Sequence, residues 1–248
     1  MIFMRLLVYN IAYGTGSPRT ALELLGNAPS YLRPQERYFK AITHLVAHFS
    51  PDVAGFLEID KGSFRTRGVS QTAQLAELLQ NDPEKPFYSK YAPNSYLSRL
   101  PYCRHQTNAL LVRSGMAETE WVDFMPCGAK RLILGCCYEG INILLVHLAL
   151  TSPARRRQLD YLAELTAGKE KVLVCGDFNT FGGSKELVDF QQKSHLVSAN
   201  IGHLPTYPAR HPVKELDYIM HSQDLHLKNF RIIRFPGSDH LPLLAEFE

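Results

Sequence analysis

The sequence has few cysteines, and none in a spacing typical of metal or redox sites. They are odd in number, include no Cys-x-x-Cys pair and lie mostly in strand-like apolar runs. A thiol in such a run behaves as a small apolar group. We therefore expect reduced, structural cysteines at Cys103, Cys127, Cys136, Cys137 and Cys175.

Long apolar runs, linkers and repeats are also absent. No stretch of 18 apolar residues occurs, and the chain starts in a strand pattern without a basic-then-apolar leader. We therefore expect no transmembrane segment and a soluble, cytoplasmic protein. Because 248 residues with 45% hydrophobic content can bury a large core, we expect one domain over residues 1–248, with a monomer as the default.

The chain has little excess charge of either sign. Its formal net charge is +3 and its pI is near 8.5. This balance permits an anionic substrate, but it does not demand nucleic acid as a partner.

The hydrophobic pattern alternates between strand-like and helix-like segments. Glu139 and Gly140 predict a tight hairpin, and Ser152 with Pro153 predicts the N-cap and first turn of a helix. Apolar runs predict strands over residues 3–11, 52–59, 107–112, 131–138, 141–150, 171–175, 215–220 and 241–247. Helical spacing predicts helices over residues 35–49, 69–79, 152–167 and 184–193.

The apolar run 171–175 leads directly into Gly176, Asp177, Phe178 and Asn179. Residues two apart on a strand point the same way, so Asp177 and Asn179 would project together from the strand end. A carboxylate and an amide oxygen form a hard-oxygen pair suited to Mg²⁺ or Mn²⁺. Asp and Asn also initiate turns, so the tetrapeptide alone leaves both interpretations open.

Two more polar residues interrupt apolar strands. Glu58 lies at the end of its strand, where a carboxylate must be paired, solvated or bound to a metal. His147 lies in an apolar strand, where a histidine is usually a satisfied core residue unless a carboxylate faces it.

The C-terminal part of the chain brings a histidine together with acidic residues. Asp217 lies in a predicted strand, and Asp239 immediately precedes His240. A histidine that transfers a proton needs a carboxylate to fix its tautomer and orientation. This arrangement suits a general base.

The order of these motifs resembles the endonuclease/exonuclease/phosphatase superfamily, the DNase I-like hydrolases. The resemblance covers about residues 4–247, and weaker similarities at 60–63, 106–111 and 157–158 look like prokaryotic members. The ordered motifs are Asn10, Phe56-Leu57-Glu58-Ile59, Val146-His147-Leu148, Gly176 to Asn179, Leu216-Asp217-Tyr218-Ile219 and Ser238-Asp239-His240.

The resemblance implies a fold and a set of roles. The fold is a four-layer α/β/β/α sandwich, with two mixed sheets face to face and helices outside. Glu58 would bind Mg²⁺, with Asn10 beside it and Asp239 sharing the ion. Asp177 and Asn179 would orient the attacking water and contact the phosphate or a second metal. Asp217 would hold His240 as general base or proton donor, and His147 would stabilise the same negative charge.

The substrate is the least specified part of this prediction. A basic loop and an aromatic, basic segment could clasp a phosphate or headgroup, although the loop could equally be solvated and strand aromatics more often pack in cores. We expect a Mg²⁺-dependent (or Mn²⁺-dependent) hydrolase of a small or lipid-derived phosphoester. The alternatives are a DNA or RNA nuclease and a catalytically silent binding module. The candidate substrate-binding residues are Arg65, Arg67, Arg99, Arg104 and Asn108, with Tyr91, Tyr96 and Tyr102.

Overall fold

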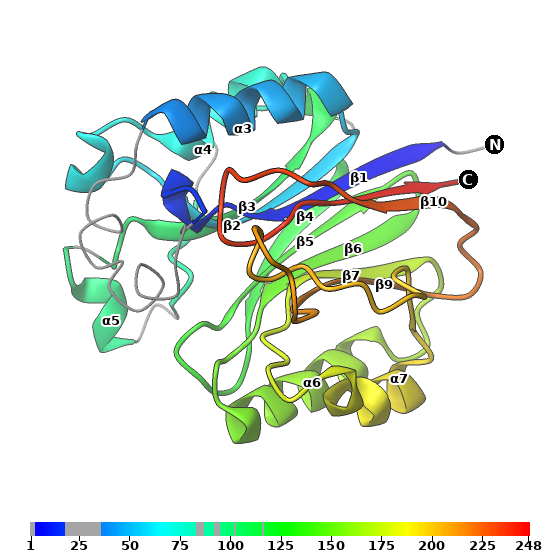
Figure 1. The fold of residues 1–248 in the computed structure, drawn as a ribbon. Helices are drawn as coiled ribbons and strands as arrows, with labels where there is room; N and C mark the ends of the chain where they lie inside the picture. The colour runs from blue at the N-terminus through cyan, green and yellow to red at the C-terminus, as the bar shows by residue number, and fades with distance from the viewer. Residues whose placement is uncertain (1–2, 18–35, 83–86, 92–94, 102, 116) are drawn as a thin grey trace.

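A computed structural model describes residues 3–17, 36–82, 87–91, 95–101, 103–115 and 117–248. Two β-sheets pack face to face, and helices cover both outer faces (Figure 1). The start of β1 and the end of β11 lie at one end of the sandwich, and the turn that follows β1 lies at the other. The predicted four-layer α/β/β/α sandwich is therefore confirmed.

The first sheet has a parallel pair of strands at its centre. The crossover between these two strands runs through α3 (Glu36–Phe49), which packs with α4 (Gln71–Leu78) on the outer face of the sheet. The remaining neighbours are antiparallel. The strand order is β10 (Leu227–Ile232), β11 (Leu243–Phe247), β1 (Met4–Asn10), β2 (Val53–Asp60) and β3 (Gln106–Val112).

The second sheet repeats this plan. Its parallel pair, β6 (Ile141–His147) and β7 (Val172–Asp177), is connected through α6 (Ser152–Thr166), which covers the outer face together with α7 (Val188–Ser194). The strand order is β4 (Ala117–Phe124), β5 (Leu132–Tyr138), β6 (Ile141–His147), β7 (Val172–Asp177), β9 (Asp217–His221) and β8 (Val197–Ser198). Short helical segments are η1 (Ala12–Gly14), η2 (Phe64–Thr66), α5 (Tyr96–Arg99), η3 (Arg113–Gly115) and η4 (Ser184–Leu187).

Three apolar clusters fill the spaces between these layers. One lies between the two sheets, and the others lie between each sheet and its helices. Gly55 lets the sheets approach closely, because a Cβ there would lie 2.6 Å from Leu145 Cδ1. Among the described helices, none combines the length and apolarity that a membrane crossing requires.

The predicted elements are present, with corrections at the sheet edges and helix ends. β4, β8 and β10 were not predicted, and all three are edge strands. Edge strands are half-solvated, so β4 and β10 carry no continuous apolar run. The N-cap of α6 is Thr151 rather than Ser152, and its side chain makes no capping hydrogen bond. The predicted helix over 184–193 divides into η4 and α7. The hairpin at Glu139 and Gly140 is confirmed.

Replacing Gly176 tests the contact between the two central strands of the second sheet. Gly176 has φ +136°, and an added Cβ would lie 1.9 Å from the carbonyl oxygen of Val146. We expect Gly176→Ala to lower the free energy of unfolding by about 3 kcal/mol or more. Gly140→Ala is the control, since Gly140 has φ +74° but no atom within 4 Å of an added Cβ. It should cost about 1 kcal/mol, and equal losses in urea denaturation would contradict the steric argument.

Candidate active site

Three polar side chains form a row across the central strands of the second sheet. His147 ends β6 and pairs in register with Asp177 at the end of β7. Asp177 pairs in turn with Asp217 at the start of β9. Residues paired across strands point to the same face of a sheet, and all three are buried. His147 Nε2 lies 3.3 Å from Asp177 Oδ2, so a carboxylate does face this histidine.

His240 reaches this row from the loop before β11. Its Nδ1 lies 2.8 Å from Asp217 Oδ2, and its Nε2 lies 3.8 Å from Asp177 Oδ2. The Thr206 hydroxyl donates to the same oxygen, Asp217 Oδ2, at 2.6 Å, so this oxygen has two partners. Ser238 Oγ donates to the backbone oxygen of Asn10 and accepts the His240 N–H, so the loop is tied to β1.

The two histidines carry different charges because their neighbours differ. Burial opposes the charge on His240, but Asp217 and Asp177 outweigh it and raise its pKa to about 10. Burial and the adjacent Lys130 lower the pKa of His147 to about 4. Burial opposes the charge on Asp177, yet the histidines hold the pKa of its carboxyl well below its usual value. At neutral pH, His240 is therefore charged and His147, at the end of the row, is neutral.

The first sheet contributes Asn10 and Glu58. Asn10 Nδ2 donates to Asp177 Oδ2 at 3.0 Å, which joins the two sheets directly. Glu58 has φ +51° at an irregularity in the pairing of β2 with β3, between Phe56 and Ile59. A left-handed conformation is rare for a non-glycine strand residue and often marks functional sites. The Glu58 N–H donates to Asn108 Oδ1 at 3.3 Å.

The donor set suits a hard divalent cation. Burial, together with the nearby Glu58 carboxylate, raises the pKa of the Asp239 carboxyl. Two carboxylates that repel each other in a buried site are stabilised by a cation between them. Ligand atoms of Asp177, Asp217 and His240 also lie within 4.8 Å of one another. Their contacts are those of hydrogen-bonded acid–histidine pairs, so Glu58, Asp239 and the Asn10 amide are the better candidates for the metal.

Asn179 lies near Asp177, but the two side chains do not extend from one strand as predicted. β7 ends at Asp177, and Asn179 has φ +52°, so the two residues do not project together from one strand. A turn joins them instead. The Asn179 N–H donates to Asp177 Oδ1 at 2.9 Å, and its side-chain amide donates to the backbone oxygen of Leu148 at 2.8 Å. The turn interpretation is therefore confirmed, and the role of the pair in a site stays a prediction.

Two lysines outside the predicted site residues reach Glu58. Lys90 Nζ lies 3.3 Å and Lys130 Nζ lies 3.4 Å from Glu58 Oε1. Lys90 comes from the aromatic, basic segment and Lys130 from the connection between β4 and β5. Because β4 was not predicted, the β4–β5 hairpin that carries Lys130 was not predicted either. The position of Lys130 beside Glu58 could therefore not be inferred from the sequence.

The predicted basic clasp is only partly available to a substrate. Arg65 is 5% exposed, and its guanidinium pairs with Asp60 Oδ2 at 2.9 Å and lies 3.8 Å from the Tyr13 ring centroid. Its predicted place in a substrate clasp is therefore wrong, because a buried charge needs a buried partner and Asp60 supplies it. Arg67, Arg99, Arg104 and Tyr96 are exposed, and Asn108 is buried beside Glu58. Tyr91 donates to Gln106 Oε1, and Tyr102 lies outside the described residues.

An aromatic wall lies beside His240. The Tyr207 ring is centred 4.9 Å from the imidazole, and Phe181 packs edge-on to Tyr207 at 6.2 Å. Burial and the carboxylates of Asp239 and Asp177 raise the pKa of Tyr207 to about 12, so its hydroxyl stays protonated. Exposed apolar side chains occur on the loops that carry this pair, at Phe181, which contacts Tyr207, and at Leu204 and Val213 on the loop that contains Tyr207.

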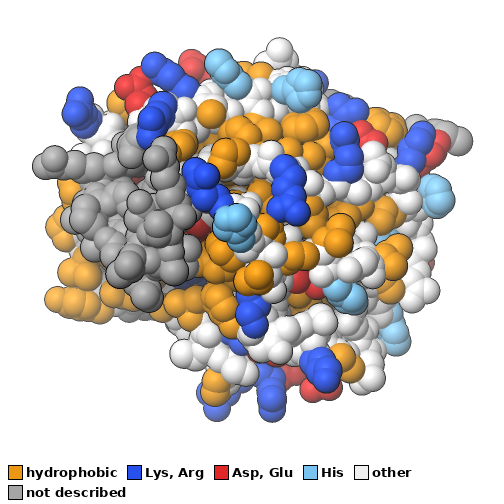
Figure 2. Space-filling view, in the orientation of Figure 1, with side chains coloured by type: hydrophobic (Ala, Val, Ile, Leu, Met, Phe, Trp, Pro, Cys, Tyr) orange, Lys and Arg blue, Asp and Glu red, His pale blue; other side chains and the backbone are white. Residues whose placement is uncertain are grey.

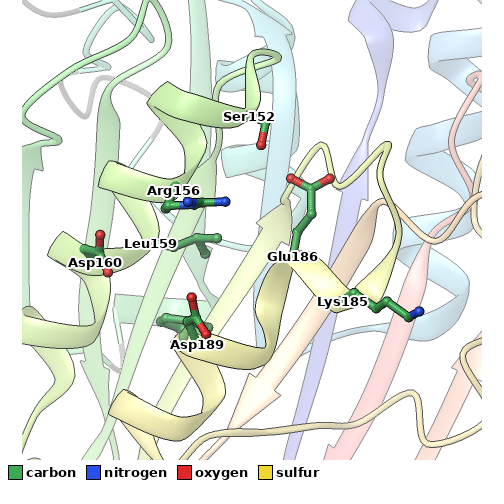
Figure 3. A pocket seen from close by; sticks show the side chains of 8 residues that line it. Ser152, Arg156, Leu159, Asp160, Lys185, Glu186 and Asp189 are labelled. Carbon is green, nitrogen blue, oxygen red and sulfur yellow. The ribbon is translucent and has the colours of Figure 1, made fainter.

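A separate hollow lies on the outer helical layer, between α6 and the segment formed by η4 and α7 (Figure 3). It measures about 70 Å³ and carries charges of both signs. Its lining residues are Ser152, Arg156, Leu159, Asp160, Lys185, Glu186, Asp189 and Phe190. Because these residues lie on the opposite face of the sheet from the row, we assign the candidate active site to the row.

Comparisons with known proteins agree with the fold. A model of the endonuclease/exonuclease/phosphatase family matches residues 7–240. The catalytic domain of human Nocturnin, solved with a sulfate anion, has TM-score 0.69 and 19% identity, covering 99% of this chain and 94% of that one. A mannosyl-6-phosphatase from Bacteroides thetaiotaomicron has TM-score 0.65 and 14% identity, covering 99% of both chains. D. rerio TDP2 with a single-strand DNA product has TM-score 0.64 and 13% identity, covering 100% of both. A search of curated proteins found no matching sequence.

The charge on His240 should make stability depend on pH in the alkaline range. Its pKa is about 10 in the folded protein against 6.5 ordinarily, so its stabilisation is complete below pH 6.5 and is lost as pH rises toward 10. In chelator, the free energy of unfolding should fall between pH 7 and 10 by about 2–4 kcal/mol more in the wild type than in His240→Gln. The exposed His44 provides the control His44→Gln, which should follow the wild type. Parallel curves for the wild type and His240→Gln would refute the assigned charge.

Proposed function

Because the chain belongs to the endonuclease/exonuclease/phosphatase family, whose members are hydrolases acting on phosphoester bonds, we propose that it is a Mg²⁺-dependent phosphoester hydrolase, with Mn²⁺ as the alternative ion. The observation that carries this proposal is that polar residues of both sheets meet at one carboxylate, that of Asp177. Asp177 contacts His147 on the neighbouring strand of its own sheet, and from the first sheet it meets Asn10 at the end of β1 and His240 in the loop before β11. A catalytically silent binding module has no physical need for this set.

We assign the metal to Glu58, with Asp239 and the Asn10 amide oxygen beside it. Asn10 Oδ1 accepts the Ala12 N–H at 3.1 Å, which holds the amide in a fixed orientation. A carboxylate and an amide oxygen are the ligand types that Mg²⁺ takes from proteins. When bound, the ion supplies a Lewis acid for the phosphoryl oxygen.

The remaining residues act on water and on developing charge. Asp177 and the Asn179 turn orient the attacking water for in-line displacement at phosphorus. His240, held by Asp217 and charged at neutral pH, donates to the phosphoryl oxygens, so of its two predicted roles the charge favours the donor. His147 stays neutral and contacts Asp177 from the other side. No covalent enzyme intermediate is needed.

Two observations favour a small or lipid-derived substrate over a nucleic-acid duplex. A duplex requires many Lys and Arg contacts along one face. Arg65 is buried, and on the face in Figure 2 the basic side chains are dispersed among hydrophobic ones rather than gathered in a stripe. The loops beside His240 instead expose apolar side chains, among them Phe181, Leu204 and Val213. A nuclease acting at the same residues is the competing function, and TDP2 with its single-strand DNA product shows a relative of the fold with such a ligand.

Glu58→Gln should separate the metal role from folding. We expect kcat/KM to fall by about 100-fold or more, because an amide replaces the carboxylate that holds the cation. Calorimetry should show weaker Mg²⁺ binding, while urea unfolding shows a native fold. The exposed Glu77 gives the control Glu77→Gln, which should retain both activity and affinity. Full wild-type activity in excess chelator would exclude a metal-dependent reaction.

The substrate class is tested by comparing plasmid DNA, a single-stranded oligonucleotide, soluble phosphoesters and lipid phosphoesters. The double variant Leu204→Ser, Val213→Ser should lose about tenfold in kcat/KM on lipid esters and little on soluble ones, because it removes apolar contact area only. Phe64→Ser, which removes an exposed apolar side chain from η2, is the control. Efficient plasmid nicking at physiological salt would favour the nuclease instead.

A further inference from the structure

We propose that Lys90 and Lys130 form a phosphate-binding pair that makes the site selective for phosphomonoesters over phosphodiesters. This inference rests on the proposed hydrolase function and narrows its substrate class. It concerns two residues outside the motif row, and it starts from their contacts with Glu58.

The two ammonium groups converge on one carboxylate oxygen. Lys90 Nζ lies 3.3 Å and Lys130 Nζ lies 3.4 Å from Glu58 Oε1. Lys130 Nζ also lies 2.5 Å from His147 Nε2, at the edge of the row. The Lys90 and Lys130 side chains are only 4% and 17% exposed, so both are held inside the site rather than on its rim.

Backbone hydrogen bonds build this pair into the fold. The N–H groups of Arg131 and Leu132 both donate to the backbone oxygen of Lys90, at 3.0 and 3.3 Å. The side chain of Gln158 on α6 donates to the backbone oxygen of Lys130 at 3.0 Å. Two segments distant in sequence are thus locked together at the point from which both lysines extend. Such fixed cations are preorganised for a ligand, because little side-chain entropy is lost on binding.

A third donor lies at the same place. Asn108 accepts the Glu58 N–H through its Oδ1, which turns its side-chain NH₂ away from that bond. The buried Nδ2 has no hydrogen-bond partner among the described residues. A buried donor without a partner is costly, and a ligand oxygen would relieve that cost. Lys90, Lys130 and Asn108 therefore all present hydrogen-bond donors around Glu58, the lysines at its carboxylate and Asn108 beside its backbone.

The charge balance explains why the ligand should be a dianion. Without ligand, two lysines share the Glu58 carboxylate. A divalent cation on Glu58 places two further positive charges beside them, and buried cations without a counter-charge are strongly unfavourable. A phosphomonoester carries close to two negative charges above its second pKa near 6, whereas a diester carries one. Lys90 and Lys130 would balance the second negative charge, which the monoester carries and the diester lacks.

The experiment compares 4-nitrophenyl phosphate with bis(4-nitrophenyl) phosphate at pH 7 in Mg²⁺. The wild type should prefer the monoester, and Lys130→Met should lower kcat/KM by about 30-fold on the monoester but less than about threefold on the diester. Lys130→Arg should restore most of the monoester rate, because the charge remains. Lys193→Met is the matched control, since Lys193 forms an exposed pair with Asp160.

A binding measurement separates this inference from catalysis. Titration of inorganic phosphate into the Mg²⁺-loaded protein, a readout independent of turnover, should show affinity at least about tenfold weaker in Lys130→Met than in the wild type. Three results would overturn the proposed role of the lysine pair. They are a wild-type preference for the diester, equal losses of kcat/KM on both esters in Lys130→Met, and unchanged phosphate affinity in that variant. Hydrolysis of neither ester with any divalent ion would count against the proposed hydrolase, and the phosphate titration would still decide on the lysines.

Discussion

The structure of the site depends on compensating one buried charge, the Asp177 carboxylate. Its Oδ2 accepts from Asn10 at 3.0 Å and lies 3.3 Å from His147, while its Oδ1 accepts the Asn179 N–H. An isolated carboxylate in this position would be prohibitively costly. Each compensating group comes from a different strand end or turn, so satisfying Asp177 requires the two sheets to meet at this edge in one arrangement.

The sheet topology explains why the polar groups gather at one edge. Each sheet has a central parallel pair, β1 with β2 and β6 with β7, and each pair is connected through an outer helix. The carboxyl ends of parallel strands lie at the same edge of a sheet. Asn10, Glu58, His147 and Asp177 all lie at or next to such strand ends. Face-to-face packing of the sheets then brings the two sets together.

The sequence predicted the strand ends and the polar residues at them, because an apolar run interrupted by a single polar residue can be recognised from the sequence alone. It did not predict pairing register, which alone aligns His147, Asp177 and Asp217 in one row. It also misplaced Arg65, because nothing local to a basic loop shows that its charge is matched by Asp60. Edge strands such as β4 are half-solvated and lack the apolar signal. The lysine on the hairpin after β4 was missed for the same reason.

The two histidines show how register determines protonation. Both lie within 4 Å of the same Asp177 oxygen, so that carboxylate alone cannot distinguish them. His240 also meets Asp217, which favours its charged form. His147 instead meets Lys130, which disfavours a second positive charge. A shift of one residue in the pairing of β7 with β9 would turn Asp217 to the other face and remove the counter-charge of His240. The protonation state of His240 is therefore a property of strand pairing as much as of residue type.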